Sequence, residues 1–311
     1  MASVTPAMIK ELRERTSAGM SDCKNALVEA DGDMEKAVEI ILKKGIVKAA
    51  SRAGKVATEG EVATWVSADG KRGVIVEVNC QTDFVARGDD FRGFVKNVVE
   101  VASKLAKGKD LAAEKYPGSD KTIDQVRQEM VGRIGENIVV RRWDAVEASG
   151  ANGLVQAYVH MGGKLAVLLS ADAPNAEARG NTELKNFVEN CAMQIAAMSP
   201  LVVRKEDVDQ GQIEKQKEIF QAQLKEEGKP EQAWPKIIEG KVSKWFTEVT
   251  LLGQDNVWDP GAGSVDKIRG ELGKKLGGEV KLEGFVRFGL GEGIEKKVEN
   301  LADEVAKTIG A

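Results

Sequence analysis

The fold is decided by a stretch of sequence that occurs twice. Residues 60–97 read GEVATWVSADGKRGVIVEVNCQTDFVARGDDFRGFVKN, and residues 153–190 read GLVQAYVHMGGKLAVLLSADAPNAEARGNTELKNFVEN. Aligning the two stretches without gaps places Gly60 on Gly153, Gly70 on Gly163 and Phe94 on Phe187. Each copy predicts a strand, a glycine turn, a second strand, a loop and a helix. Similarity at a fixed spacing indicates a duplicated structural unit.

A third strand is expected to close each copy. The two segments correspond when Ile138 is placed on Val280, an alignment that we call the third-strand alignment. It pairs the apolar positions Ile138, Val140, Trp143 and Val146 in the first copy with Val280, Leu282, Phe285 and Phe288 in the second. The two third strands lie further apart in the chain than the two first strands or the two second strands do. The second copy therefore carries an insertion before its third strand.

The inserted segment predicts helices. Residues 205–249 are charged and helix-prone around Gly228-Lys229-Pro230, which predicts an inserted antiparallel helical hairpin, or coiled coil. A structural spur and an arm that grips a partner both fit this hairpin.

Residues 1–45 predict a compact three-helix unit. Thr5 followed by Pro6 suits an N-cap and a first helical position, and Ser21 and Asp33 are expected to cap the second and third helices. Lys43-Lys44-Gly45 is expected to close the third helix. The basic segment that follows, residues 48–55, fits a solvated helical linker or a contact to an acidic partner.

Near the C-terminus, Gly289-Leu290-Gly291-Glu292-Gly293 predicts a tight turn. It lacks the Lys-Ser/Thr of a phosphate-binding loop, and Glu292 places an anion where a phosphate would sit. An amphipathic terminal helix is expected after it.

Together these patterns predict an α+β protein with five parts, in which a core of two duplicated antiparallel-sheet subdomains carries the helical elements. The parts are an N-terminal three-helix module with its linker (1–55), a core N-subdomain (56–150), a core C-subdomain (151–204 and 250–290), the hairpin insertion (205–249) and a C-terminal helical module (291–311).

Composition excludes several functional classes. The 311 residues are 42% hydrophobic and 30% charged with a net charge of −4, so no global positive field would attract nucleic acid. The single histidine, His160, excludes His-rich metal sites and most Ser-His or Cys-His relays. Cys23, Cys80 and Cys191 are far apart, which favours neither zinc nor disulfides and fits the reducing cytoplasm. We expect no secretion signal and no membrane span, because no apolar stretch approaches the roughly 20 residues that a span needs.

The loop after the second strand of copy one carries the strongest functional candidate. It contains Asp83 and Phe84, where copy two has Ala176 and Glu177. A carboxylate beside a large aromatic side chain at a strand-to-helix turn can present to a partner both a charge and an apolar ring that inserts into its surface. In the competing interpretation, Phe84 packs into its own core and Asp83 caps a helix. No nucleophile with a base and an orienting group can be assembled, which makes a hydrolase the weakest hypothesis.

Four motifs resemble the bacterial translation elongation factor Ts family. They are LRERTSAGMSDCK at 12–24, NCQTDFVA at 79–86, IGENI at 134–138 and GEGIEK at 291–296. The resemblance runs from about residue 3 to the C-terminus. It implies a guanine nucleotide exchange factor for elongation factor Tu, bound in its nucleotide-free or GDP form. It also implies a ubiquitin-associated-like (UBA-like) fold for the three-helix module, no cofactor or metal, and no covalent chemistry.

The resemblance also assigns roles to residues. It implies that Asp83 and Phe84 enter the partner's GTPase domain near its magnesium site, in a loop shaped by Thr82 and Val85. The further partner contacts that it implies are Arg13, Met20, Lys24, Ile134, Gly135 and His160. A binding adaptor, whose N-terminal module captures another protein, is the main competing hypothesis.

Overall fold

The computed structural model describes residues 4–16 and 18–295. The chain divides into two compact units. Unit 1 comprises Met1–Val62, Val76–Arg142 and Gly289–Ala311, and unit 2 comprises Ala63–Ile75 and Trp143–Phe288. The predicted five-part division of the chain stays a prediction.

The described residues form two three-stranded sheets, and each sheet keeps its strands in chain order. The first contains β1 (Glu59–Val66), β2 (Arg72–Cys80) and β3 (Ile138–Glu147), and the second contains β4 (Gly153–His160), β5 (Leu165–Asp172) and β6 (Lys281–Gly289). Strands β4 and β5 are antiparallel, with Gly153 opposite Asp172 and His160 opposite Leu165. Six predicted strands and the α+β class are thereby confirmed.

The helices after the second strand of each copy confirm the duplication. Copy one has α4 (Asp83–Arg87) and α5 (Asp89–Lys104), and copy two has α7 (Ala176–Gly180) and α8 (Thr182–Met198). The alignment of Gly60 with Gly153 places α4 on α7 residue for residue and aligns the starts of α5 and α8. The turn that carries Asp83 and Phe84 is therefore duplicated in shape although its chemistry is not.

The duplication extends further than the sequence patterns indicated, to the helix before each third strand. Helix α6 (Ile123–Ile134) follows the short 3-10 helix η1 (Leu111–Ala113), and its counterpart is α11 (Val265–Lys275). Thr122 caps α6 by accepting the Gln125 N–H at 3.2 Å, and Ser264 caps α11 in the same way. In the third-strand alignment the two caps and the two helix starts coincide.

An arginine fastens each of these helices to its third strand. Arg127 Nη1 donates to the Ile138 carbonyl at 3.0 Å, and Arg269 Nη1 donates to the Val280 carbonyl at 2.7 Å. The third-strand alignment also places these two donors and these two acceptors on each other. The same charged tie therefore sets the start of β3 and of β6.

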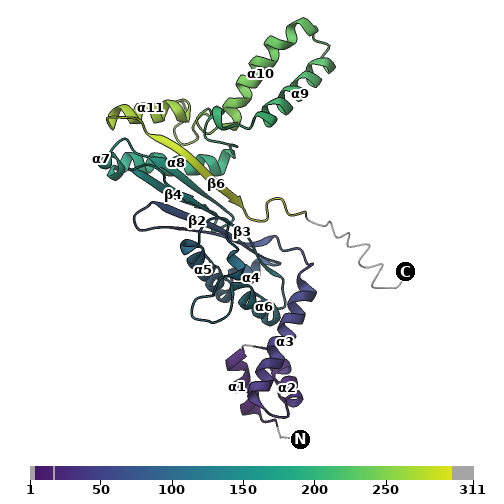
Figure 1. Cartoon of the computed structure of the whole chain (residues 1–311). Coiled ribbons are helices and arrows are strands. Elements are labelled where there is room, and N and C mark those ends of the chain that lie inside the picture. The colour runs from purple at the N-terminus through teal and green to yellow at the C-terminus, as the bar shows by residue number, and fades with distance from the viewer. Residues whose placement is uncertain (1–3, 17, 296–311) are drawn as a thin grey trace. The chain divides into compact units, whose positions relative to one another are not determined.

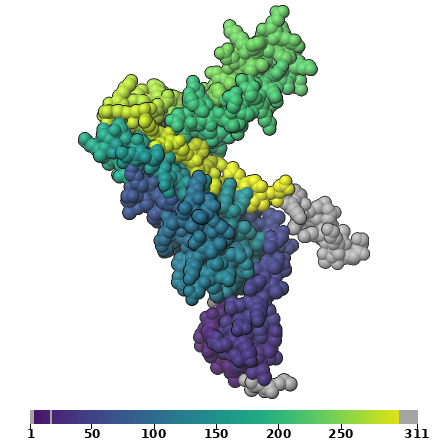
Figure 2. All heavy atoms as spheres, viewed as in Figure 1, coloured from purple at the N-terminus to yellow at the C-terminus, as the bar shows by residue number. Residues whose placement is uncertain are grey.

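The N-terminal helices are α1 (Pro6–Thr16), α2 (Met20–Glu29) and α3 (Met34–Arg52), with α1 and α2 in purple in Figures 1 and 2. Their shared core consists of Leu12, Ala18, Cys23, Ala26, Leu27, Ala30 and Ala37. Thr5 accepts the Met8 N–H at 3.3 Å, and Asp33 accepts the Lys36 N–H at 3.0 Å. Both predicted caps are confirmed, and a three-helix unit forms.

Two predicted helix ends are wrong. Helix α2 begins at Met20 with Gly19 as N-cap, so Ser21 lies inside the first turn. Helix α3 continues through Gly45 to Arg52, and the first part of the basic linker is therefore helical. Gly45 does not end the helix because it lies where α3 crosses α6, against Gly132. A tertiary contact between glycines thus outweighs the local stop signal.

The predicted hairpin is present in unit 2. It consists of α9 (Gln210–Glu226) and α10 (Trp234–Val249), flanked by the 3-10 helices η2 (Lys205–Asp207) and η3 (Glu231–Ala233). Leu224 and Val242 are buried where the two helices pack. Figures 1 and 2 show the hairpin in green, standing away from the sheet of unit 2.

The chain turns tightly after β6, as predicted. Gly291 and Gly293 have φ angles of +69° and +76°, a region that favours glycine. The Glu292 carboxylate accepts the Gly289 N–H at 3.1 Å and so occupies the turn itself. The predicted terminal helix falls, from residue 296, outside the described residues. Within residues 4–16 and 18–295, no helix is long and apolar enough to cross a membrane.

Candidate functional site

The exposed turn between β2 and α5 displays Phe84. Thr82 is the N-cap of α4, and its hydroxyl accepts the Val85 N–H at 3.4 Å. Asp83 pairs with Arg87 one turn later at 2.9 Å, and Phe84 is 85% exposed. The interpretation in which Phe84 packs into its own core and Asp83 caps the helix is therefore wrong. Thr82, and not Asp83, caps the helix, and the ring of Phe84 lies in solvent.

The turn is tied to the segment between α6 and β3. The Thr82 N–H donates to Glu136 Oε2 at 3.0 Å, and the Thr82 hydroxyl donates to Glu136 Oε1 at 2.8 Å. The Asn137 N–H donates to Gln81 Oε1 at 2.7 Å. On the strand side, the Cys80 thiol contacts the Thr82 carbonyl at 3.2 Å. Polar contacts therefore fix the base of the turn, while its tip stays exposed.

Ile134 and Gly135 lie next to this tie. Ile134 is the last residue of α6, and Gly135 ends the helix in the left-handed conformation at φ +84°. Both are partly buried, and they directly precede Glu136. The structure therefore brings the predicted loop residues Thr82–Val85 together with Ile134 and Gly135 through the Glu136 carboxylate.

The remaining predicted contact residues lie on other elements. Arg13 is on α1, and Met20 and Lys24 are on α2; all three are exposed. His160 ends β4 in unit 2, also exposed, with its Nδ1 at 3.1 Å from the Tyr158 hydroxyl and its ring stacked on Tyr158. The predicted contact residues therefore lie exposed on separate elements, and the contact roles of these residues stay predictions.

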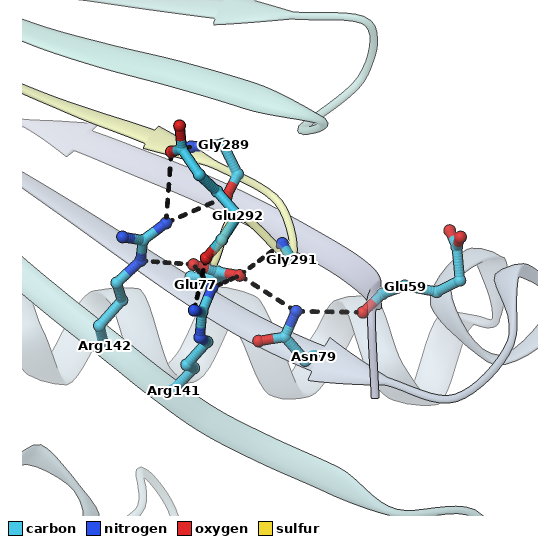
Figure 3. Close-up of polar contacts among 8 residues, drawn as sticks. All are labelled: Glu59, Glu77, Asn79, Arg141, Arg142, Gly289, Gly291 and Glu292. Carbon is cyan, nitrogen blue, oxygen red and sulfur yellow. Dashed lines mark hydrogen bonds and ion pairs between the residues drawn. The ribbon is translucent and has the colours of Figure 1, made fainter. Parts of the chain in front are cut away.

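A buried glutamate anchors the strand that leads into the turn. Glu77 of β2 is fully buried, and its carboxylate is surrounded by donors, as Figure 3 shows. It accepts hydrogen bonds from Arg141 Nη1 at 2.9 and 3.1 Å, Arg142 Nε at 2.5 Å, Asn79 Nδ2 at 3.1 Å and the Gly291 N–H at 2.8 Å. Burial raises the pKa of Glu77, but these hydrogen bonds outweigh burial and hold its pKa below the ordinary value of 4.5.

The same two arginines also hold the turn after β6. Arg141 Nη2 donates to the Glu292 carbonyl at 2.5 Å, and Arg142 Nη2 donates to the Gly289 carbonyl at 3.0 Å. The network therefore joins β2, β3 and the 289–293 turn (Figure 3). This network was not predicted from the sequence. The available signal was a single charged residue inside the apolar run Val74-Ile75-Val76-Glu77-Val78.

The three thiols of the chain are shielded from solvent. All three cysteines are buried, and burial raises the pKa of Cys23 and Cys191, which keeps those thiols protonated. Among the residues that the structure describes, no group of three or more His, Cys, Asp or Glu side chains could hold a metal ion. The main feature of the site is therefore the exposed ring of Phe84, on a turn whose base is held by polar contacts.

The fold and the site together define a class: a duplicated α+β scaffold that presents one exposed aromatic turn, suited to contact with a macromolecule. A model of the family described as Elongation factor TS matches residues 81–292. Elongation factor Ts of Clostridium perfringens (strain SM101 / Type A) is 47% identical over 309 residues, 99% of each chain. That of a Nitratiruptor species is 45% identical over 304 residues, 98% of each chain. The chain therefore belongs to the elongation factor Ts family of translation elongation factors.

Proposed function

We propose that the chain binds elongation factor Tu, in its nucleotide-free or GDP form, and promotes GDP release so that GTP can bind. It acts in the cytoplasm and performs no covalent chemistry. The observation that carries the proposal is the 85% exposed Phe84 on a turn anchored through Thr82, in a chain of the elongation factor Ts family.

The mechanism follows from thermodynamic linkage. A factor that binds the nucleotide-free GTPase better than the GDP form must weaken GDP by the same coupling free energy. Tight nucleotide binding rests on Mg²⁺, oriented backbone amides and a lysine around the phosphates. Small displacements of these groups are therefore costly in affinity. Insertion of the Asp83-Phe84 turn near the partner's Mg²⁺ and phosphate site supplies that displacement.

Phe84 is the larger of the two contributions. Its ring is already exposed on a fixed turn, so its burial in the partner gains apolar contact without unpacking this chain. An aromatic anchor of this kind commonly contributes about 2 kcal/mol or more. Asp83 is already paired with Arg87 at 2.9 Å, and an interfacial carboxylate gains little net free energy. The role of Asp83 is to disturb the polar network that holds the water ligands of the partner's Mg²⁺.

The other predicted contacts dock the factor. Ile134 and Gly135 touch the partner near its phosphate-binding region, and His160 makes a contact from unit 2. Arg13, Met20 and Lys24 belong to the contact surface of the N-terminal module, whose three helices adopt a UBA-like fold. The exposure of Met20, 63%, supports this assignment because a large apolar side chain in solvent gains free energy on burial.

Release of fluorescent GDP from elongation factor Tu tests the proposal. We expect the wild-type chain to accelerate release and Phe84→Ala to lower the stimulated rate by roughly 30-fold, the equivalent of about 2 kcal/mol. Asp83→Ala should have a smaller effect. Glu177→Ala is the matched control, because Glu177 takes the place of Phe84 in the second copy of the turn, and it should leave the rate unchanged. If neither loop substitution slows release in a folded protein, the loop assignment is wrong.

A further inference from the structure

We infer that Glu136 is the positioning residue of the exchange loop: its carboxylate fixes the turn that displays Phe84 and contacts neither the partner nor the nucleotide. The inference rests on the proposed exchange function and names the residue of this chain that prepares the loop for it.

The contacts at Thr82 show how one side chain can fix the turn. Each Glu136 oxygen takes a different donor of Thr82, Oε2 the backbone N–H at 3.0 Å and Oε1 the hydroxyl at 2.8 Å. The same hydroxyl accepts the Val85 N–H at 3.4 Å. Glu136 thus holds both the backbone and the rotamer of the residue that caps α4, two positions before Phe84.

Glu136 is itself held by its neighbours in the chain. It follows Gly135, which ends α6 at φ +84°. It precedes the buried Asn137, whose N–H donates to Gln81 Oε1 at 2.7 Å and whose Nδ2 donates to the Lys55 carbonyl at 2.8 Å. A functional side chain is most precise when its own support is rigid. The carboxylate therefore reaches Thr82 from a fixed origin.

The second copy provides an internal comparison, because it has the same turn without this carboxylate. In the third-strand alignment, Gly278 takes the place of Glu136. A Cβ atom at Gly278 would lie 2.7 Å from Cβ of Pro174, so no side chain fits there. Asn175, which replaces Thr82, instead donates through Nδ2 to the Leu276 carbonyl at 3.1 Å.

The carboxylate tie is therefore present in the copy that displays Phe84 and sterically blocked in the copy that does not. Since Asn175 caps α7 without any glutamate, the short helix does not need the tie in order to form. What Glu136 adds in copy one is a fixed orientation of the turn.

The test measures stimulated GDP release from elongation factor Tu at saturating concentrations of each variant. Glu136→Ala should lower the maximal rate roughly tenfold, the equivalent of about 1.4 kcal/mol. Glu136→Gln should restore most of it, because an amide can accept the Thr82 N–H and donate to its hydroxyl oxygen. Thr82→Val should slow release, and should slow it by a smaller factor in the Glu136→Ala background than in the wild type, since both changes remove the bond between the Thr82 hydroxyl and Glu136 Oε1. Asn175→Ala is the control for general loosening of such a turn and should leave the rate unchanged.

Each outcome decides the inference. If Glu136→Gln is as slow as Glu136→Ala, the charge of Glu136 acts directly and the positioning role is wrong. Additive effects of Glu136→Ala and Thr82→Val would also overturn it. If Glu136→Ala does not fold, an unaltered rate in Thr82→Val overturns it and a slowed rate restored in Thr82→Ser supports it. Loss of stimulation in Phe84→Ala with full activity in Glu136→Ala would reject this inference alone, whereas a wild-type chain that does not accelerate GDP release would reject the proposed function.

Discussion

The crossing of α3 and α6 gives a prediction that depends on a single methyl group. Gly132 and Gly45 face each other where the two helices meet. A Cβ atom added at Gly132 would lie 2.5 Å from Cα of Gly45 and 3.3 Å from its carbonyl carbon and oxygen. These are backbone atoms that cannot rotate away. Gly132→Ala therefore forces the helices apart.

The expected loss is the balance of two effects. Overpacking costs about 1–3 kcal/mol, and the upper part of that range applies because the obstacle is backbone. Replacement of glycine by alanine inside a helix returns about 1 kcal/mol of helix propensity. We expect Gly132→Ala to lower the free energy of unfolding by about 2 kcal/mol.

Two substitutions of the same kind serve as controls. A Cβ atom at Gly45 would meet its nearest atom, Cα of Gly132, at an ordinary 3.8 Å, and one at Gly93 in α5 would meet nothing within 4 Å. Gly45→Ala and Gly93→Ala should therefore stabilise the protein by up to about 1 kcal/mol.

Urea unfolding followed by far-UV circular dichroism measures the three variants, and amide hydrogen exchange across α3 and α6 localises the change. A Gly132→Ala protein as stable as Gly93→Ala, with unchanged exchange in α3 and α6, would refute the close crossing.

Three further predictions concern stability and the hairpin. The pKa of Glu77 is lower in the folded protein than its ordinary value of 4.5, so the ionised carboxylate stabilises the fold above pH 4.5, and this stability is lost as the pH falls through the native pKa. Glu77→Gln should lower the free energy of unfolding by about 3 kcal/mol near neutral pH. The same substitution should flatten the acid dependence of stability measured by urea titration. Arg127→Ala and Arg269→Ala should each cost about 2 kcal/mol, since each breaks the same charged tie, and a clear inequality in urea unfolding would show that the two copies are not equivalent. Replacement of residues 205–249 by a short turn should leave stimulated GDP release largely intact, and complete loss in a folded protein would show that the hairpin grips the partner.

The sequence was sufficient for the parts of the fold that depend on local patterns. The repeated pattern of strand, glycine turn and strand around Gly70 and Gly163 predicted two strand pairs, and the structure contains both. The duplication of the helix before each third strand was not predicted, although Thr122 and Arg127 recur as Ser264 and Arg269 in the alignment already found for the third strands. The apolar positions recur as well, with Ile123 on Val265, Val126 on Ile268 and Met130 on Leu272, so the sequence carried a signal for this second duplicated helix.

Features that depend on distant contacts could not be predicted. Gly45 carries a local signal for a helix end, but its contact with Gly132 of another helix decides the outcome. The charge of Glu77 inside an apolar strand indicates a buried network, yet nothing local identifies Gly291 as a donor. The two interpretations of Phe84 are separated by its 85% exposure, and the turn that displays it is held by Glu136, 54 positions after Thr82.

The affinity of the chain for elongation factor Tu, measured with and without saturating GDP, tests the exchange hypothesis most directly. An exchange factor must bind the GDP form more weakly, by the same factor by which it weakens GDP binding. A binding adaptor has no such requirement. We expect GDP to weaken the complex and the two factors to agree. Equal affinity in the presence and absence of GDP would contradict the exchange function.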